Sequence, residues 1–321
     1  MLHNQPVMAS KHFHVNLLCE GIYAVIHREG GWAMSNSGII DLGDRTVIFD
    51  TFLTPQAATD LRLIAEALLD RSVSVVVNSH YHNDHIWGNQ AFNHETDILC
   101  TSETRELIST AGMEEYTWYK ENANSKLKTL EGDIRGSSEK ASAKPLDIFW
   151  LTYYQAIVAS LPSLKIRMPN ITFTERLGLH GSKRSAELIS FEGGHTGNDT
   201  ILYLPDEEIV FMGDLLFVDC HPYLSDSKPG MIQPILKEIK AMEPAILIPG
   251  HGPVGKLDDL SQMEDYVATL EKLVLQKVKA GASLKVIENL EIPAAYKTWD
   301  FPGFFRDNLR FYYQHYSDPE T

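Results

Sequence analysis

Four residues able to bind a metal ion lie within one six-residue stretch of the sequence. They are His80, His82, Asp84 and His85, and they follow a run of valines that ends at Val77. Imidazole and carboxylate groups are ligands for zinc, and also for iron and manganese. The chain has only thirteen histidines in 321 residues, so three of them beside an aspartate indicate a metal site rather than a polar loop.

The expected backbone of this stretch predicts two metal positions. A strand points alternate side chains to one side, so the first two histidines converge if the chain stays extended between them. Asn83-Asp84 favours a turn, which carries Asp84 and His85 to a second point nearby. Two ligands for each metal are too few for a tight site, and the rest of the chain must supply more.

Three later residues stand where a predicted strand meets a loop. His195 lies between Gly194 and Thr196, and glycine lets the backbone approach a ligand closely. Asp214 follows the strand predicted at 209–212, where it either bridges two metals or caps a turn. His251 follows the strand predicted at 245–248. The recurrence of His and Asp at strand ends predicts that one edge of a sheet sandwich carries the ligands.

Four other residues are candidates for supporting or substrate-binding roles. Asp50 ends a predicted strand, and either caps the next helix or orients a ligand histidine through its free N–H. Thr196 can brace the loop of His195. His221 either contacts substrate or serves as an acid, or else it is a structural loop histidine, and Tyr223 lies in the same segment.

Composition narrows the classes of function. The net charge of −15 disfavours binding to nucleic acid, although bound dications can reverse the local field for small anionic substrates. Three cysteines without close spacing, and an N-terminus without an apolar core region, favour a cytoplasmic protein. Since no window approaches about 18 consecutive apolar residues, we expect no membrane span. The expected partner is a small-molecule substrate, and association into a homo-oligomer is left open.

The hydrophobic pattern predicts alternating strands and helices on both sides of an insert. Residues 102–165 are expected to form a helical insert with a mobile loop at 132–144. Its aromatic residues Trp150, Tyr153 and Tyr154 either shape a substrate pocket or pack a core. Helices are expected from 257 onward, and the aromatic residues of the last, 304–316, are expected to pack on the sheet or to form an oligomer contact.

These motifs resemble the metallo-β-lactamase superfamily, over residues 15 to 275 apart from the insert. The resemblance rests on His80-x-His82-x-Asp84-His85, then His195, Asp214 and His251 in their local contexts. It implies an α/β fold, a four-layer αβ/βα sandwich of two mixed β-sheets with a helical insert. A single domain would cover residues 12–321, with the insert at 102–165 and C-terminal helices at 257–321.

The resemblance also implies a ligand set and a reaction. Two divalent metal ions are expected, zinc foremost, with iron or manganese as alternatives. One ion would take His80, His82 and His195, the other Asp84, His85 and His251, and Asp214 would bridge them. The expected enzyme is a metallo-hydrolase, in which the hydroxide of a dinuclear centre attacks a small ester-like substrate such as a lactone, thioester or β-lactam. Asp84 and Asp214 are the expected catalytic residues.

Two departures within the superfamily bear on the reaction. One branch of β-lactamases places a cysteine where Asp214 stands, and the diiron redox branch carries a glutamate at the place of His82. The first comparison favours the hydrolases with a bridging aspartate, and the second argues against an oxygen-reducing role. A phosphodiesterase and a mononuclear-iron dioxygenase of thiols or persulfides remain alternatives, and the full ligand set argues against a relative without enzymatic activity.

Overall fold

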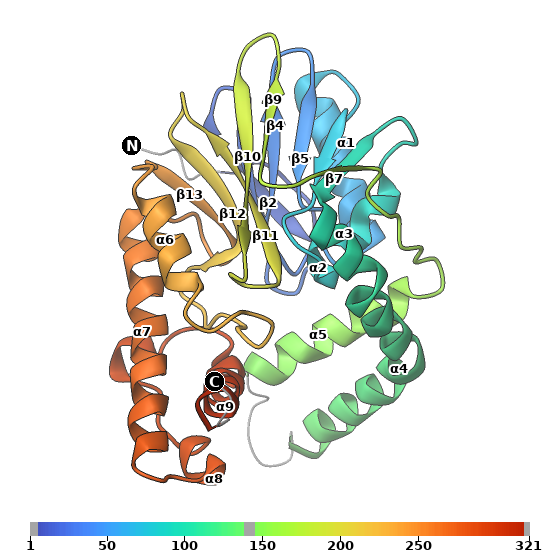
Figure 1. Cartoon of the computed structure of the whole chain (residues 1–321). Helices are drawn as coiled ribbons and strands as arrows, with labels where there is room; N and C mark the ends of the chain where they lie inside the picture. The colour runs from blue at the N-terminus through green and yellow to red at the C-terminus, as the bar shows by residue number, and fades with distance from the viewer. Residues whose placement is uncertain (1–5, 138–144, 318–321) are drawn as a thin grey trace. The chain divides into compact units, whose positions relative to one another are not determined.

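The computed structural model of the chain describes residues 6–137 and 145–317 (Figure 1). The chain divides into two compact units, Met1–Glu187 and Leu188–Thr321. Each unit contains sheet and helix, and each is described by itself below.

The first unit contains a mixed sheet, which has eight strands among the described residues and follows the sequence order from β1 to β8. Pairing is antiparallel from β1 to β5 and parallel from β5 to β8. The residues of β4, β5 and β6 are all buried, which suits the apolar, β-branched sequences of β5 and β6. The strands are β1 (Pro6–Ala9), β2 (Phe13–Cys19), β3 (Ile22–His27), β4 (Ser37–Asp41), β5 (Thr46–Phe49), β6 (Val75–Val77), β7 (Asp97–Thr101) and β8 (Ile171–Phe173).

Helix α1 (Pro55–Leu69) covers part of this sheet and begins where the sequence predicts. The hydroxyl of Thr54 caps it by accepting a hydrogen bond from the amide of Ala57 at 3.2 Å, and Pro55 occupies the first turn. The helix ends at Asp70, which adopts a left-handed conformation with φ 49°. Its buried face packs into the core beside the strands with Ala57, Ala58, Leu61 and Ala65.

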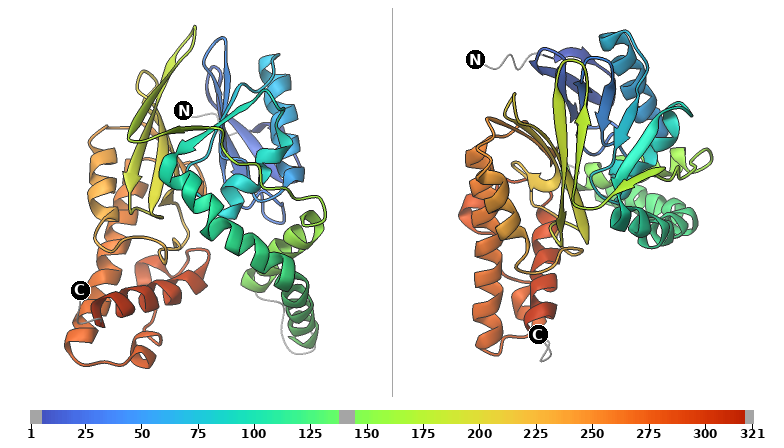
Figure 2. Two further views of the ribbon diagram at one scale, coloured as in Figure 1. Left: turned by 45° about the vertical axis from the view of Figure 1, so that its right-hand side comes forward. Right: turned by 45° about the horizontal axis from the view of Figure 1, so that its top comes forward.

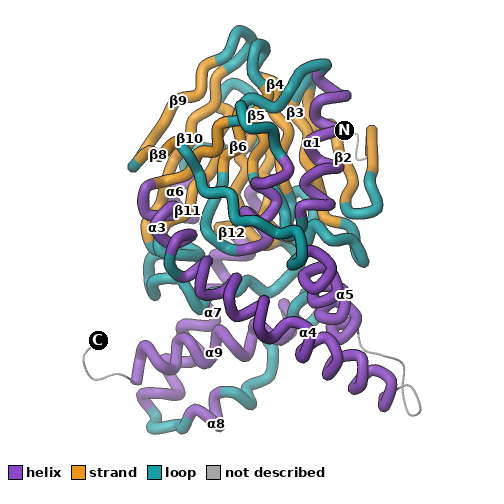
Figure 3. Tube along the Cα trace, turned by 90° about the vertical axis from the view of Figure 1, so that its right-hand side faces the viewer, coloured by secondary structure: helices purple, strands orange, loops and turns teal. Residues whose placement is uncertain are grey.

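Within the described residues, the insert of the first unit contains three helices, α3 (Ser102–Ser109), α4 (Ala111–Ser137) and α5 (Pro145–Ser160). Helices α4 and α5 lie side by side (Figure 3) and share a core that includes Trp87, Tyr119 and Ile157. The predicted loop at 132–144 is wrong in its first part, because α4 continues to Ser137. Helix formation is cooperative, so two glycines lower the propensity of this stretch without ending the helix. Residues 138–144 lie outside the described part of the chain.

The second sheet is also mixed, with five strands among the described residues in the order β13-β12-β11-β10-β9. The boundary between the units falls within β10. β11 and β12 form the antiparallel hairpin that the sequence predicts, whereas β12 and β13 run parallel. The strands are β9 (Arg176–His180), β10 (Ser185–Glu192), β11 (Asn198–Leu204), β12 (Ile209–Phe217) and β13 (Ile246–His251).

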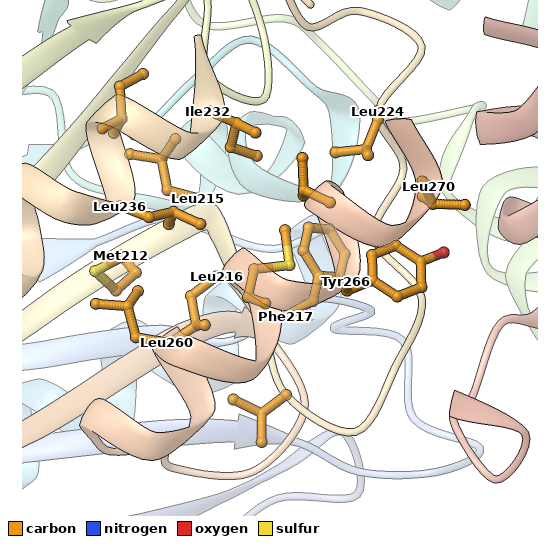
Figure 4. Packing of buried hydrophobic residues seen from close by; sticks show 14 of the residues in the cluster. Met212, Leu215, Leu216, Phe217, Leu224, Ile232, Leu236, Leu260, Tyr266 and Leu270 are labelled. Carbon is orange, nitrogen blue, oxygen red and sulfur yellow. The ribbon is translucent and has the colours of Figure 1, made fainter. Parts of the chain in front are cut away.

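Helices of the second unit enclose a large apolar core with this sheet (Figure 4). Met212 and Leu216 of β12 lie in this core with Leu236 of α6, and with Leu260 and Tyr266 of α7. Helix α9 packs against α7 (Figure 2). The helices are α6 (Ile232–Lys240), α7 (Leu257–Lys279), α8 (Leu284–Ile287) and α9 (Pro302–Ser317). None of the helices in the described ranges has the length and hydropathy needed to cross a membrane.

Gly88 provides a test of packing in the first unit. It lies in the 3₁₀ helix η1 (Trp87–Ala91), where a Cβ atom would stand 1.8 Å from the carbonyl oxygen of Thr51 and 2.5 Å from Cβ of Ala58. We expect Gly88→Ala to lower the free energy of unfolding by about 1–3 kcal/mol in denaturant titrations, because the backbone must shift.

Gly132→Ala is the matched control for this substitution. Gly132 is exposed within α4, and a Cβ atom added there would have no heavy atom of the described residues within 4 Å. The same change should there raise the free energy of unfolding by about 0.5–1 kcal/mol through helix propensity. Equal effects at the two glycines would contradict the packing described for η1.

Candidate metal centre

The ligand loop of the first unit begins immediately after β6. The chain bends at Ser79 and reaches the short helix α2 (Asn83–Ile86), with His82 at the N-cap position. Although the loop is not a continued strand, Nε2 of His80 lies 3.1 Å from Nδ1 of His82. The predicted convergence of these two rings is therefore present, and a bend rather than an extended chain produces it.

Asp84 and His85 lie in the first turn of α2 and bring two more donor groups to the same loop. The ring of His85 lies 4.2 Å from the ring of His80, centroid to centroid, and its Nε2 atom lies 3.7 Å from Oδ2 of Asp84. His80 and His85 are fully buried. The first unit thus gathers the four candidate ligands of the sequence motif into one cluster.

The carboxylate of Asp50 fixes the orientation of this cluster. It accepts hydrogen bonds from the amide of Ser79 at 2.7 Å, the hydroxyl of Ser79 at 2.7 Å and Nδ1 of His85 at 2.8 Å. Because an ionised carboxylate only accepts, the N–H of His85 must be at Nδ1, which leaves Nε2 as the atom able to bind a metal. The capping hydroxyl of α1 belongs to Thr54, so the contacts of Asp50 are those of an orienting residue.

Opposing effects act on the pKa of Asp50. Burial raises the pKa of this carboxyl above its ordinary value, while His85 and the donors of Ser79 act in the opposite direction. The hydroxyl of Ser79 also lies 2.8 Å from Nδ1 of His80. Since that hydroxyl gives its own proton to the carboxylate, Nδ1 of His80 must donate to it, and the Nε2 atom of His80 faces away from this bond.

A second network holds the backbone of the ligand loop. The carbonyl oxygen of His85 accepts from the amide of Thr51 at 2.9 Å, the hydroxyl of Thr51 at 3.1 Å and the side chain of Asn78 at 3.2 Å. The side chain of Asn89 accepts from both Thr51 and Asn78. Sequence reasoning missed Asn78, Ser79 and Asn89 because their residue types are ordinary in loops, and their position between strand end and helix was the only available signal.

The insert contacts the ligand loop through Asn83. Its side-chain amide donates to Glu115 of α4 at 3.1 Å and to the hydroxyl of Tyr153 of α5 at 2.9 Å, and the hydroxyl of Tyr119 lies 2.9 Å from that of Tyr153. Burial raises the pKa of Tyr153, and Tyr119, Glu115 and Asp84 raise it further. Tyr153 therefore remains a neutral hydrogen-bonding group that ties the insert to the residue preceding Asp84.

The second unit contributes His195, Asp214 and His251. Oδ2 of Asp214 lies 3.3 Å from Nε2 of His195 and 3.3 Å from Nε2 of His251. His195 precedes β11 and His251 is the last residue of β13. Asp214 lies within β12 rather than after it, because this strand continues to Phe217 with an irregular register next to Gly213.

Gly250 leaves space for one ligand of this second cluster, and the carboxylate of Asp199 holds the loop of another. A Cβ atom at Gly250 would stand 1.8 Å from Oδ1 of Asp214, so only glycine fits beside that carboxylate. The carboxylate of Asp199 accepts from the amides of His195 at 2.8 Å and Thr196 at 3.0 Å, and from the hydroxyl of Thr196 at 2.9 Å. The structure therefore places Thr196 as a brace of the His195 loop.

His221 and Tyr223 occupy different surroundings within the second unit. Nδ1 of His221 lies 2.8 Å from the hydroxyl of Tyr266, and its ring packs against Trp299 and Phe305. Burial lowers the pKa of His221 to about 4, so the ring is neutral at neutral pH. Such an enclosure is typical of a structural histidine. The ring of Tyr223, in contrast, lies 6.4 Å from that of His195.

The donor set fits divalent metal ions. All seven predicted ligands belong to groups of His and Asp able to hold a metal ion in the described part of the chain. Imidazole nitrogens and carboxylate oxygens without a thiolate suit zinc, iron and manganese alike. The candidate ligands are therefore compatible with divalent metal ions.

Asp50→Asn tests the orienting role of the carboxylate. The substitution keeps the shape but places an amide where the proton of Nδ1 points, so we expect affinity for zinc to fall by about 10–100-fold in a competitive chelator titration. Asp70→Asn is the matched control, since both aspartates have positive φ, 63° and 49°, and Asp70 is exposed. Unchanged metal affinity in Asp50→Asn would rule out the orienting role.

Gly250→Ala tests the space beside Asp214. The added methyl group displaces the carboxylate, and we expect zinc affinity to fall by about tenfold or more while the circular dichroism spectrum is retained. Gly303→Ala is the control, because no heavy atom of the described residues lies within 4 Å of its added Cβ. Zinc affinity equal to that of the native chain in Gly250→Ala would contradict this, because the carboxylate of Asp214 could then move away from the added methyl group without weakening metal binding.

Comparison with known proteins identifies the family. The family model described as the metallo-beta-lactamase superfamily matches residues 30–251, well over half of the chain. No curated protein gives a significant match. A metallo-beta-lactamase from Pontibacter korlensis has 16% sequence identity and a TM-score of 0.56, with 80% of this chain and 99% of that chain covered.

Two further solved structures are similar to the same extent. A metallo-beta-lactamase from Erythrobacter litoralis has 14% identity and a TM-score of 0.56, covering 82% of this chain and 99% of its own. One from Hirschia baltica has 14% identity and a TM-score of 0.56, covering 80% and 98%. At this identity the likeness establishes the fold, and it confirms the predicted α/β class with two mixed sheets. The chain belongs to the metallo-β-lactamase superfamily.

Proposed function

We propose that the chain is a metal-dependent hydrolase with a dinuclear metal centre. His80, His82 and His195 would hold one ion, Asp84, His85 and His251 the other, and Asp214 both. The observation that carries this proposal is the position of the family match, which runs continuously from residue 30 to 251 and includes all seven ligands.

The chain's own residues have distinct tasks in such a hydrolase. When bound, two divalent ions supply a hydroxide nucleophile at neutral pH and positive charge for the developing oxyanion. Asp84, whose side chain is 15% exposed, orients the nucleophile or passes a proton to the leaving group. Asp50 and Ser79 hold the imidazoles of His85 and His80 so that their Nε2 atoms remain free of protons.

We further propose a small ester-like substrate such as a lactone, a thioester or a β-lactam. The net charge of −15 disfavours polyanionic substrates, and the aromatic residues close to His195 and His251 favour partly apolar ones. The three solved relatives named above are metallo-beta-lactamases, which supports a hydrolytic reaction at a carbonyl group. The expected compartment is the cytoplasm.

Two substitutions and their controls test the metal centre. We expect His82→Ala and Asp214→Ala to lose bound metal and to lower kcat/KM by at least about a hundredfold on the substrate that the native chain hydrolyses. His94→Ala and Asp206→Ala remove the same residue types from exposed positions and should leave both properties unchanged. Retained turnover in both ligand variants would overturn the assignment.

Metal analysis combined with a substrate panel tests the reaction. Purified protein is assayed by plasma mass spectrometry and with a lactone, a thioester, a β-lactam and a phosphodiester. About two zinc or manganese ions per chain with turnover of a carbonyl substrate support the proposal. One iron per chain, with oxygen uptake on a thiol substrate and no hydrolysis, would replace it with a dioxygenase, and turnover of the phosphodiester alone would replace it with a phosphodiesterase.

A further inference from the structure

Six aromatic rings of the second unit form a closed cycle that includes two of the candidate metal ligands. Each ring contacts the next at a centroid distance between 5.0 and 6.4 Å. The cycle, called the aromatic cycle below, runs from His251 to Phe301, Phe304, Tyr223, His195 and Phe217 and back to His251. Because Asp214 lies 3.3 Å from both histidines, the other four rings border the ligand cluster of this unit.

The four rings of the cycle that are not histidines differ in how far their residues are exposed to solvent. Phe217 is 2% exposed and stacks on His251 from within the core, whereas Tyr223, Phe301 and Phe304 are only partly buried. Phe305, the next residue on α9, is 2% exposed and belongs to the core. Phe217 and Phe305 are thus core residues, whereas Tyr223, Phe301 and Phe304 combine ring contacts with partial exposure to solvent.

The backbone of Phe301 is held in a conformation that costs energy. Its φ of 58° lies in the left-handed region, which bulky residues rarely adopt. The preceding residue, Asp300, is fixed on both sides, since its amide donates to the carbonyl of Asp219 at 2.9 Å and its carbonyl accepts from the amide of His221 at 2.9 Å. These bonds hold the strained residue so that its ring meets that of His251 edge to face, at an angle of 87°.

Acidic residues near Phe301 indicate the chemistry of the group that the three partly buried rings would contact. Asp219 and Asp300 are exposed and flank the segment, and Asp214 lies at the ligand cluster itself. Away from the metal ligands, Asp219 and Asp300 would repel a negatively charged substituent, whereas an alkyl or aryl group would cover apolar ring surface.

We propose that Tyr223, Phe301 and Phe304 determine substrate specificity by contacting an uncharged, apolar acyl group next to the scissile carbonyl. The proposal rests on the hydrolase function proposed above. These residues do not take part in the chemistry, and they select substrates by the apolar area that the acyl group buries.

Chain-length dependence in the zinc-loaded, full-length protein tests this inference. With acyl thioesters from butanoyl to octanoyl, kcat/KM of the native chain should rise about fourfold for each added methylene that is buried, the ratio that corresponds to about 0.8 kcal/mol. In Phe301→Ala and Phe304→Ala most of this rise should be lost, so that kcat/KM falls much more on octanoyl thioester than on butanoyl thioester. Metal content should equal that of the native chain.

Phe311→Ala is the matched control. Phe311 lies on the same helix as Phe304 and is also partly buried, but it is outside the aromatic cycle. Its chain-length profile should follow that of the native protein. An equal loss on all thioesters in Phe301→Ala, or a native profile without any dependence on chain length, would overturn the proposed role of these rings.

A binding measurement separates this inference from the hydrolase proposal. If no carbonyl substrate is turned over, the hydrolase proposal fails, and the rings are then tested by calorimetric titration of the zinc-loaded protein with butanoate and octanoate. Tighter binding of octanoate in the native chain, abolished in Phe301→Ala and kept in Phe311→Ala, supports an apolar subsite. Equal affinity for both carboxylates overturns it.

Discussion

A buried carboxylate with three donors is the constraint on which the ligand cluster of the first unit depends. Asp50 is 1% exposed, and leaving such a group without its hydrogen bonds would cost far more free energy than any one bond contributes. Its donors come from Ser79, directly before His80, and from His85 on α2. These bonds join the end of β5 to the ligand loop and to α2. They hold the three segments in one arrangement, which sets the positions of the candidate ligands.

The candidate ligands of the second unit are held in position by different interactions. The carboxylate of Asp199 holds the loop of His195 through the backbone amides of His195 and Thr196. Gly250 leaves the space that the carboxylate of Asp214 occupies, and the irregular register at Gly213 lets β12 continue past it. Hydrogen bonds to the carboxylate of Asp50 thus position the ligands of the first unit. In the second unit, the space beside Gly250 allows the carboxylate of Asp214 to take its position next to a strand.

Much of the site can be inferred from the sequence because its chemistry is carried by residue type. Histidine and aspartate are rare enough at strand ends that His80, Asp214 and His251 stand out, and short β-branched runs such as Val75–Val77 indicate the strands before them. The supporting network is harder to infer, since Asn78 and Asn89 are common loop residues whose bonds appear only when the chain has folded. The sequence pattern places Phe301 at the start of a packing helix and gives no sign of its strained backbone, because the bonds from Asp300 to Asp219 and His221 join segments some eighty residues apart in the sequence.

The aromatic enclosure of His221 also has a consequence under acidic conditions. Burial lowers the pKa of this imidazole from 6.5 to about 4, with a partly compensating bond to the backbone of Tyr296. In the unfolded chain the ring takes up a proton near its ordinary pKa, whereas the folded unit resists protonation until the pH is much lower. The stability that the neutral ring contributes is therefore complete above pH 6.5 and declines as the pH falls toward 4. The packing that fixes this loop thus sets an acid limit on the second unit, independent of any metal.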